Sequence, residues 1–236
     1  LPIRSQEMRL PIKPLKLQLH VFIFFLIVSI VPAYAEEDTN KVWEGFNVGL
    51  GLPFLDVASD IDYPNAIASD PSDYEDGINL YLEYMAPLGH KVLVGGELMV
   101  SYNRGAAEDS ARYNGANLHL ANWRVGVDHS TRIMGKLAVA ARPKTLLYAG
   151  VGIEKVSFSF TQDVVSSGAT FQHADKLNGH VLAAGIDQIV SDKMSLRIEV
   201  SHTDIDRQLY QNGQFDTPVW INPDIRTARV SVRYHF

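Results

Sequence analysis

The chain has 236 residues, no cysteine and a formal net charge of −6 at pH 7. The absence of cysteine excludes a disulfide framework and any metal site built from thiolates. The acidic balance argues against nucleic acid as a partner, because proteins that bind it gather Lys and Arg on one surface.

Residues 1–35 have the composition of a secretory signal peptide. Basic residues at positions 9, 13 and 16 precede the apolar run 21–31, and the small-residue sequence "AYA" follows at 33–35. This order is typical of a cleavable export signal, and the residues before Met8 indicate a mis-assigned start. The alternative is a membrane-spanning helix, but such a helix needs about 20 apolar residues. We therefore predict that the mature protein is a single domain, residues 36–236.

This domain alternates between apolar and polar residues in segments that are separated by turn-forming residues. Alternation with period 2 is typical of β-strands whose two faces meet different environments. Eight strands are predicted, over residues 43–52, 77–86, 91–102, 125–141, 145–160, 177–189 and 194–203, and in the closing sequence "ARVSVRYHF". In the fifth segment the alternation changes near Lys155, which predicts either a β-bulge or the point where the strand leaves a membrane. The stretch 117–123 either extends the fourth strand or forms a small hairpin.

The connections between these segments are alternately short and long. The short ones are 87–90, 142–144 and 191–193, and the long ones are about 53–76, 103–124, 161–176 and 204–225. Short periplasmic turns that alternate with longer extracellular loops are typical of bacterial outer-membrane barrels. We therefore predict an all-β fold, an eight-stranded antiparallel up-and-down transmembrane β-barrel with four extracellular loops.

Ten charged residues fall on the polar faces of the predicted strands, five acidic and five basic. They are Glu83, Glu97, Glu154, Asp187, Glu199, Arg132, Lys136, Arg197, Arg229 and Arg233. An eight-stranded barrel is only wide enough for side chains to fill it, and unpaired charges there would be costly. We therefore predict a charge network that plugs the lumen. The expected contacts are Glu97 with Lys136, Glu199 with Arg229, and Arg197 and Arg233 with Glu83 or Asp187.

The apolar faces are then predicted to contact lipid, with aromatic residues near the strand ends. These aromatic residues are Tyr84, Tyr102, Tyr234 and Phe236, and such positions are typical of the girdles of membrane barrels. Two alternatives keep the apolar face inside: a soluble barrel of the lipocalin kind and a secreted β-sandwich. The near-cancelling charges on the polar face favour the membrane barrel.

The segments "LLYAGVGIEK", "MSLRIEVSHTDI" and "RVSVRYHF" resemble the small eight-stranded outer-membrane proteins of Gram-negative bacteria, the porin-like and outer-membrane-protein-A-like barrels. The resemblance implies an outer-membrane location, contact with lipopolysaccharide, and loops that can hold an extracellular ligand. In that family the last strand ends in an aromatic residue that the barrel-assembly machinery reads. Val232, Tyr234 and Phe236 match this assembly signal.

Some barrels of this size are enzymes that modify lipid A, and the sequence "EVSHTDID" contains residues of the types they use. His202 supplies a general base, Ser201 supplies a hydroxyl, and Asp204 or Asp206 supplies a carboxylate. However, the His-x-Ser-Asn order of the deacylases is absent. Neighbouring residues of a strand also point to opposite faces, so Ser201 and His202 cannot meet. We interpret them as polar residues at the rim.

The first long loop is rich in carboxylates, which are ligands for Ca²⁺ or Mg²⁺. They are Asp56, Asp60, Asp62, Asp70, Asp73, Glu75 and Asp76. Their spacing does not match an EF-hand, and acid-rich loops are commonly just solvated, so we predict neither a metal nor a cofactor. The sequence thus favours a non-enzymatic integral outer-membrane protein with a structural or surface-interaction role. A lipid A-modifying enzyme and a small-solute channel are the alternatives.

Overall fold

The computed structural model describes residues 41–62, 72–104, 107–112, 119–164, 168–211 and 218–236. The predicted signal peptide, residues 1–35, lies outside the described residues and stays a prediction. Among the residues that are described, no helix is long and apolar enough to cross a membrane.

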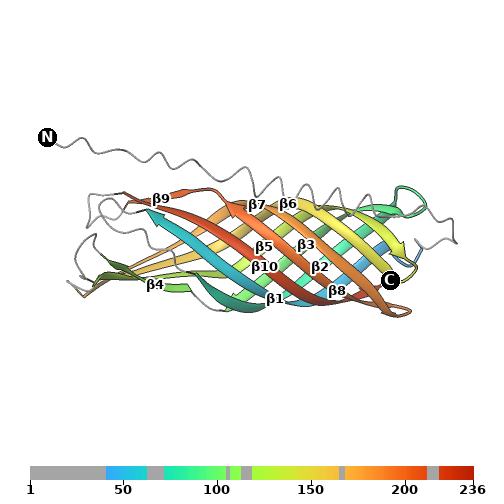
Figure 1. Cartoon of the computed structure of the whole chain (residues 1–236), viewed down its shortest axis with the longest axis horizontal. Coiled ribbons are helices and arrows are strands. Elements are labelled where there is room, and N and C mark those ends of the chain that lie inside the picture. Colours follow the sequence, from blue (N-terminus) through green and yellow to red (C-terminus); the bar gives the residue numbers. More distant parts are fainter. Residues whose placement is uncertain (1–40, 63–71, 105–106, 113–118, 165–167, 212–217) are drawn as a thin grey trace, which may run out of the picture. The chain divides into compact units, whose positions relative to one another are not determined.

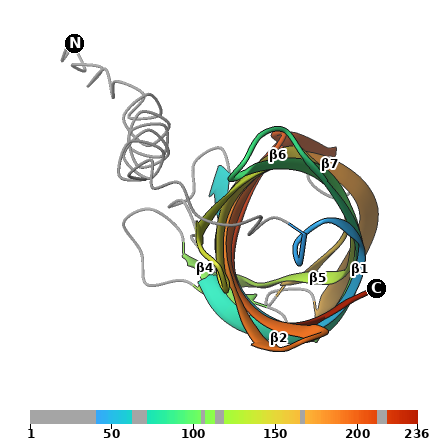
Figure 2. The same ribbon diagram turned by 90° about the vertical axis from the view of Figure 1, so that its right-hand side faces the viewer.

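In this described part of the chain, eight long strands form a closed barrel. Each strand pairs with its neighbours in antiparallel fashion, and the last strand pairs with the first (Figures 1 and 2). In chain order the strands are β1 (Gly45–Asp62), β2 (Ser72–Pro87), β3 (Val92–Arg104), β5 (His119–Arg142), β6 (Thr145–Val164), β7 (Ala169–Ser191), β8 (Met194–Ile205) and β10 (Pro218–His235). The predicted eight-stranded up-and-down barrel is therefore confirmed.

Two short strands add to the wall at the end opposite the C-terminus (Figure 1). Strand β4 (Ala107–Arg112) pairs with the first residues of β5, and β9 (Gln208–Gln211) pairs with the first residues of β10. The stretch 117–123 thus belongs to the fourth long strand from His119 onward. It also takes part in a local pairing with β4, so each of the two expectations for it holds in part.

The three predicted short turns join β2 to β3, β5 to β6 and β7 to β8. The four predicted long loops, by contrast, are too long as stated. Strand β1 continues to Asp62 instead of ending near residue 52, β2 begins at Ser72, and β6 and β7 occupy most of 161–176. The strands therefore extend well beyond the length that the alternation of apolar and polar residues suggests.

Strand β6 shows why the sequence pattern underestimates the strands. From Leu147 to Ile153, which is 58 % exposed, its outward residues are apolar; from Lys155 onward the outward residues are polar. Its inward residues change in the opposite sense, and Val156 and Phe158 are buried. The strand has 20 residues, whereas about 9–11 suffice to cross a bilayer. Along this one continuous strand, the apolar face is first on the outside of the barrel and then on the inside.

The change near Lys155 is therefore not a bulge in β6. Pairing of β6 with β7 runs without a register shift from Thr145 to Val164. A shift lies instead in the neighbouring strand β5, between Val127 and His129, so that Asp128 is the extra residue. Of the two explanations predicted for this change, a bulge in the fifth segment is excluded, because a reversal of polarity looks like a shift of register when only the sequence is read. The other explanation, that the strand leaves the membrane there, agrees with the polar outward residues from Lys155 onward.

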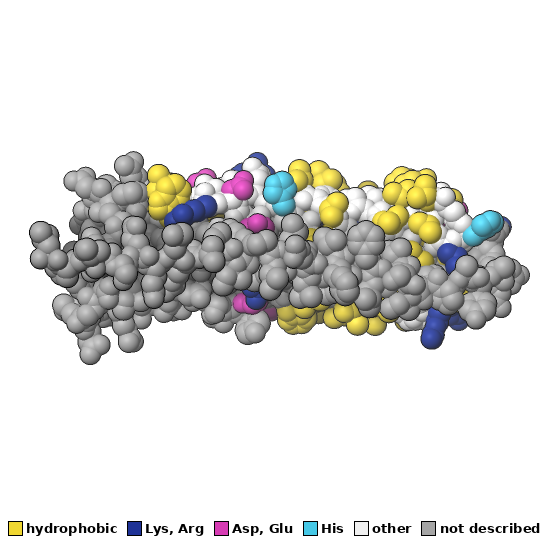
Figure 3. Space-filling model, turned by 45° about the horizontal axis from the view of Figure 1, so that its top comes forward, with side chains coloured by type: hydrophobic (Ala, Val, Ile, Leu, Met, Phe, Trp, Pro, Cys, Tyr) yellow, Lys and Arg dark blue, Asp and Glu magenta, His cyan; other side chains and the backbone are white. Residues whose placement is uncertain are grey.

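The barrel thus has two halves, which we name by their connections. The turn half carries the short turns and corresponds to residues 145–153 of β6; the loop half corresponds to 155–164. Outward apolar residues gather over the turn half, towards the end at which the C-terminus lies (Figure 3). In the loop half the apolar residues form an interior cluster, made of Leu55, Val57, Val125, Val127, Val156, Phe158, Phe160, Leu177, Ile205, Ile221 and Ile225. The loop half is consequently built like a water-soluble barrel.

The chain enters the barrel through a turn at Gly45. The φ angle of Gly45 is 93°, in the left-handed region that favours glycine. The segment before it lies inside the ring of strands (Figure 2). This places Trp43, which has no exposed surface, in the lumen at the mouth of the turn half. Its ring packs edge-on against His235 with 5.6 Å between centroids.

Candidate functional site

The lumen of the turn half holds a network of charged side chains. The side chains of nine of the ten predicted lumen residues are at most 5 % exposed and belong to this network. They are Glu83, Glu97, Arg132, Lys136, Asp187, Arg197, Glu199, Arg229 and Arg233. They come from six strands, and the period-2 alternation of each strand turns them toward the barrel axis.

Arg197 of β8 makes four hydrogen bonds to carboxylates of the network. Its Nε and Nη2 bind the two carboxylate oxygens of Asp187 at 2.8 and 3.0 Å, in the bidentate geometry that suits guanidinium. Its Nη1 lies 2.8 Å from Glu97 Oε2, and its Nη2 lies 2.8 Å from Glu83 Oε2. These carboxylates come from β2, β3 and β7. Arg197 therefore joins opposite sides of the barrel wall.

Two further basic residues, Lys136 and Arg233, form ion pairs with Glu83. Lys136 Nζ lies 2.7 Å from Glu83 Oε2 and also donates to Glu97. Arg233 binds Glu83 through Nη1, which also lies 2.9 Å from Asp187 Oδ2. The pair of Glu97 with Lys136 that is expected from the sequence is therefore present. The expected contacts of Arg197 and Arg233 are also present, and each of these arginines contacts both Glu83 and Asp187.

A second group surrounds Glu199, nearer to the loop half. Arg132 Nη2 lies 2.8 Å from Glu199 Oε1 and 2.7 Å from Glu97 Oε1, so it links the two groups. Arg229 donates to the same oxygen of Glu199. The expected pair of Glu199 with Arg229 is therefore also present, and neither residue faces lipid.

Glu154 is the one predicted lumen residue that lacks an ion pair among the described contacts. Its side chain points inward, and hydroxyl groups hold it: Ser130 Oγ donates to Oε1 at 2.6 Å and Thr203 Oγ1 donates to Oε2 at 2.7 Å. With Glu154, five acidic residues match five basic residues. The sequence analysis did not assign Ser130 or Thr203 to this site, although their strand positions share the inward parity of the charged residues.

Two tyrosines that the sequence analysis did not assign to the site also belong to it. Tyr148 Oη donates to Glu199 Oε2 at 2.6 Å, and the rings of Tyr148 and Tyr81 lie 4.8 and 4.7 Å from the Arg197 guanidinium carbon. The rings occupy space that glycines leave open: an added Cβ would meet Tyr81 at Gly49 and Tyr148 at Gly185 within 2.5 Å. Arg197 is thus held by aromatic faces as well as by carboxylates.

Apolar layers lie on both sides of the charged layer. Toward the short turns the layer consists of Trp43, Met85, Leu93, Ala138, Ala140, Leu146 and Tyr148, with Ile189 packed against it. Toward the loops the interior cluster of the loop half fills the barrel. The described inward side chains therefore form three layers along the barrel, and the middle one is ionic.

The residues considered for hydrolysis do not form a catalytic group. Ser201 and His202 are neighbours in β8 and face opposite sides of the wall. His202 Nδ1 lies 3.0 Å from Asp224 Oδ1 of β10 on the outer face, and Asp224 is a partner that the sequence analysis missed. The strand neighbours of His202 are Leu182 and Arg226, which carry no hydroxyl. Ser201 is therefore not placed where His202 and Asp224 could activate it.

The acidic residues of the first predicted loop are distributed along two strands. In the described part of the chain, β1 contains Asp56, Asp60 and Asp62, and β2 contains Asp73, Glu75 and Asp76. Glu75 is buried, and the backbone N–H of Val127 donates to its Oε1 at 3.4 Å. Within the described residues no group of three or more potential metal ligands is found, and Asp70 lies outside them.

Aromatic residues lie at both ends of the outward apolar belt, and most of them are at the end with the short turns. At the end with the short turns, Phe46 packs against Tyr84 with ring centroids 4.8 Å apart, and Tyr234 packs against Phe236 at 5.1 Å. At the other end, Tyr102 is 63 % exposed. Such belts are typical of proteins that cross a bilayer, because aromatic rings favour the interface between lipid and water.

A closed barrel with an apolar belt, aromatic residues at the ends of that belt and an ionic lumen defines a class of protein: the integral β-barrels of bacterial outer membranes. The comparison with protein families agrees. Residues 21–236 match the model of the outer membrane protein β-barrel domain, and the chain belongs to this family. It is therefore a transmembrane protein of the Gram-negative outer membrane, with short periplasmic turns and the loop half on the extracellular side.

The search of solved structures finds barrels that are similar at low sequence identity, and the fold is shared with one whose TM-score exceeds 0.5. The outer membrane protein OprG from Pseudomonas aeruginosa is 17 % identical, with a TM-score of 0.55 over 82 % of this chain and 97 % of that one. Ail, the attachment invasion locus protein of Yersinia pestis, is 11 % identical, with a TM-score of 0.44 over 82 % of this chain and 99 % of that one. No curated protein matches the chain in sequence.

Proposed function

We propose that this outer membrane protein is a non-enzymatic barrel with a closed lumen. It contributes to the envelope as a structural element, and it presents the loop half as a surface for recognition outside the cell. The observation that carries the proposal is the ionic network around Arg197, because it is packed between two apolar layers. A solute that crossed the barrel would have to separate buried ion pairs, and separating such pairs is costly.

Passage of ions and small sugars through the purified protein tests the closed lumen. In planar bilayers we expect no conductance steps, and in proteoliposomes we expect sugar uptake equal to that of protein-free vesicles. Heat-modifiable gel mobility of the same sample establishes that the barrel is folded, and a general porin serves as the positive control. Stepwise ohmic conductance by the folded barrel would favour a small-solute channel instead.

The non-enzymatic part of the proposal rests on the separation of Ser201 from His202 by the wall of the barrel. We expect that cells carrying Ser201→Ala or His202→Ala have the same lipid A species as cells with the unchanged protein. Mass spectrometry of extracted lipid A makes the comparison. A difference in acylation with either variant would support the enzyme alternative.

We further propose that Val232, Tyr234 and Phe236 form the assembly signal. All three point outward near the periplasmic end of the barrel, and Phe236 is 78 % exposed. A machinery that inserts barrels needs side chains that remain reachable on the outer face. Phe236→Asp should lower the amount of protein in the outer membrane and raise the amount in the periplasm. His235→Gln, a change at the neighbouring inward residue, is the control; equal losses for both variants would contradict the signal.

A further inference from the structure

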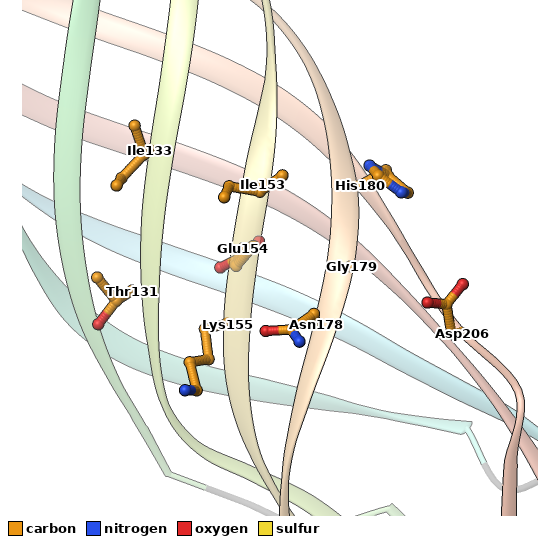
Figure 4. Close-up of a pocket in the computed structure, with 9 residues that line it drawn as sticks. All are labelled: Thr131, Ile133, Ile153, Glu154, Lys155, Asn178, Gly179, His180 and Asp206. Carbon is orange, nitrogen blue, oxygen red and sulfur yellow. The ribbon is translucent and has the colours of Figure 1, made fainter.

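The outer wall of the barrel has a pocket of about 400 Å³ where the apolar belt ends. Strands β5, β6 and β7 line it, together with Asp206 just after β8. One row of its outward side chains is Ile133, Ile153 and His180, and the next row toward the loops is Thr131, Lys155 and Asn178 (Figure 4). Hydrophobic and polar side chains thus meet within one pocket, which opens to the outside of the protein and not to the lumen.

The apolar part of the pocket lies on the membrane side. Ile133 and Ile153 are each 58 % exposed, and Val151, one step further into the belt, is 63 % exposed. In the folded protein these side chains face lipid, since they continue the apolar belt of the turn half. A molecule that fills this part of the pocket must be apolar itself, and acyl chains occupy this depth of the membrane.

The polar part of the pocket carries positive charge. Lys155 is exposed, and it stands beside Asn178 across the β6–β7 pairing. Lys176, two residues from Asn178 and on the same face of β7, is its diagonal neighbour. Diagonal neighbours of this kind are about 7–8 Å apart, so the two ammonium groups can flank one anion. Within the described residues, neither lysine takes part in an ion pair.

Glu154 also lines the pocket, but its carboxylate points into the barrel, where two hydroxyl groups donate to it. The exposed carboxylates lie on one side of the pocket. Asp206 lines it next to the end of β8, and Asp204 pairs in register with His180. An anion in the pocket would therefore be repelled from the β8 side and held over β6 and β7, near Lys155 and Lys176. An isolated Lys at the end of an apolar belt is stabilised by a phosphate of the adjacent leaflet, because Coulomb attraction is strong at the edge of the low-dielectric region.

From these observations we infer that the pocket binds a phosphorylated lipid of the outer leaflet. Lys155 and Lys176 hold the phosphate group of the lipid, Asn178 and Thr131 contact its polar headgroup, and Ile133 and Ile153 contact the first carbons of an acyl chain. The inference depends on the outer-membrane location and is independent of the closed lumen, so either can fail without the other.

Native mass spectrometry of the full purified chain in detergent tests the inference, with EDTA present so that no divalent cation can bridge the partners. Three probes are compared: diphosphorylated lipid A, the same lipid without its phosphates, and inorganic phosphate. We expect adducts with diphosphorylated lipid A, at least tenfold weaker adducts with the dephosphorylated lipid, and no displacement by equimolar inorganic phosphate. Equal binding of the two lipids, or displacement by phosphate, would overturn the inference.

Variants locate the binding. Lys155→Gln and Lys176→Gln should each weaken the adduct with diphosphorylated lipid A, and the double variant should weaken it by about tenfold or more, since each removes one charge-assisted contact. Lys155→Arg should keep it. Lys144→Gln, which changes an exposed lysine in a periplasmic turn, is the matched control. An unchanged affinity in the folded double variant would place the lipid elsewhere on the barrel and refute the inference.

Discussion

Replacing Arg197 by Met should lower the free energy of unfolding of the barrel by about 3–5 kcal/mol, the range for breaking a buried ion pair by removing one partner. Arg197 contacts three carboxylates, those of Asp187, Glu83 and Glu97. Without Arg197, the only described ion-pair partner of Asp187 is Arg233. Urea unfolding in lipid vesicles, followed by tryptophan fluorescence, measures the change.

Two further variants show whether the loss arises from uncompensated charge. Arg226→Met removes an exposed arginine whose contact with Asp224 is 3.7 Å, and surface pairs of this kind contribute at most about 1 kcal/mol. Arg197→Met combined with Asp187→Leu removes both partners of the bidentate pair, and we expect it to recover part of the lost free energy. If Arg197→Met costs no more than Arg226→Met, the ionic network does not determine the stability of the turn half.

Replacing Phe158 by Ala should lower the free energy of unfolding by about 3–5 kcal/mol, the range for a large aromatic residue in a packed core. Phe158 is 1 % exposed inside the loop half. Its neighbour Ser157 points outward, and Ser157→Ala should change the stability by less than about 0.5 kcal/mol. The contrast between adjacent residues tests whether the loop half has a core of its own. Similar effects of the two variants would contradict the assigned interior.

The outer face of the same strand gives the complementary test. Val151 lies in the lipid-facing belt, where an arginine costs about 2–4 kcal/mol if it is near the bilayer midplane. Ser159 lies on the same face of β6 but in the loop half, where water surrounds the barrel. We expect Val151→Arg to be destabilising and Ser159→Arg to be nearly neutral. Equal costs would mean that the lipid-facing belt continues along the whole strand.

The sequence by itself determined the fold class, the strand order and the inward face of the turn half. Period 2 places Glu97, Lys136, Glu199 and Arg229 on one face of their strands. Charges of opposite sign on that face, in a barrel too narrow for water-filled space, must pair. The residues that meet across neighbouring strands follow from strand direction and from their distance along each strand from its periplasmic end, because antiparallel neighbours bring residues of similar height together.

Only the tertiary structure decided how far the strands continue and what lies across the lumen. From the sequence, Leu55 is expected in a loop and Phe158 beyond a bulge. The alternation of apolar and polar residues shows that the two faces of a strand differ, but it does not show which face is inside the barrel. Above the membrane the outer face meets water, so the polarity reverses while the strand continues. Likewise, Arg197 reaches Asp187 on the adjacent strand, as expected, but also Glu97 on a distant one. That contact depends on the stagger and curvature of the closed barrel, which no local pattern of residues encodes.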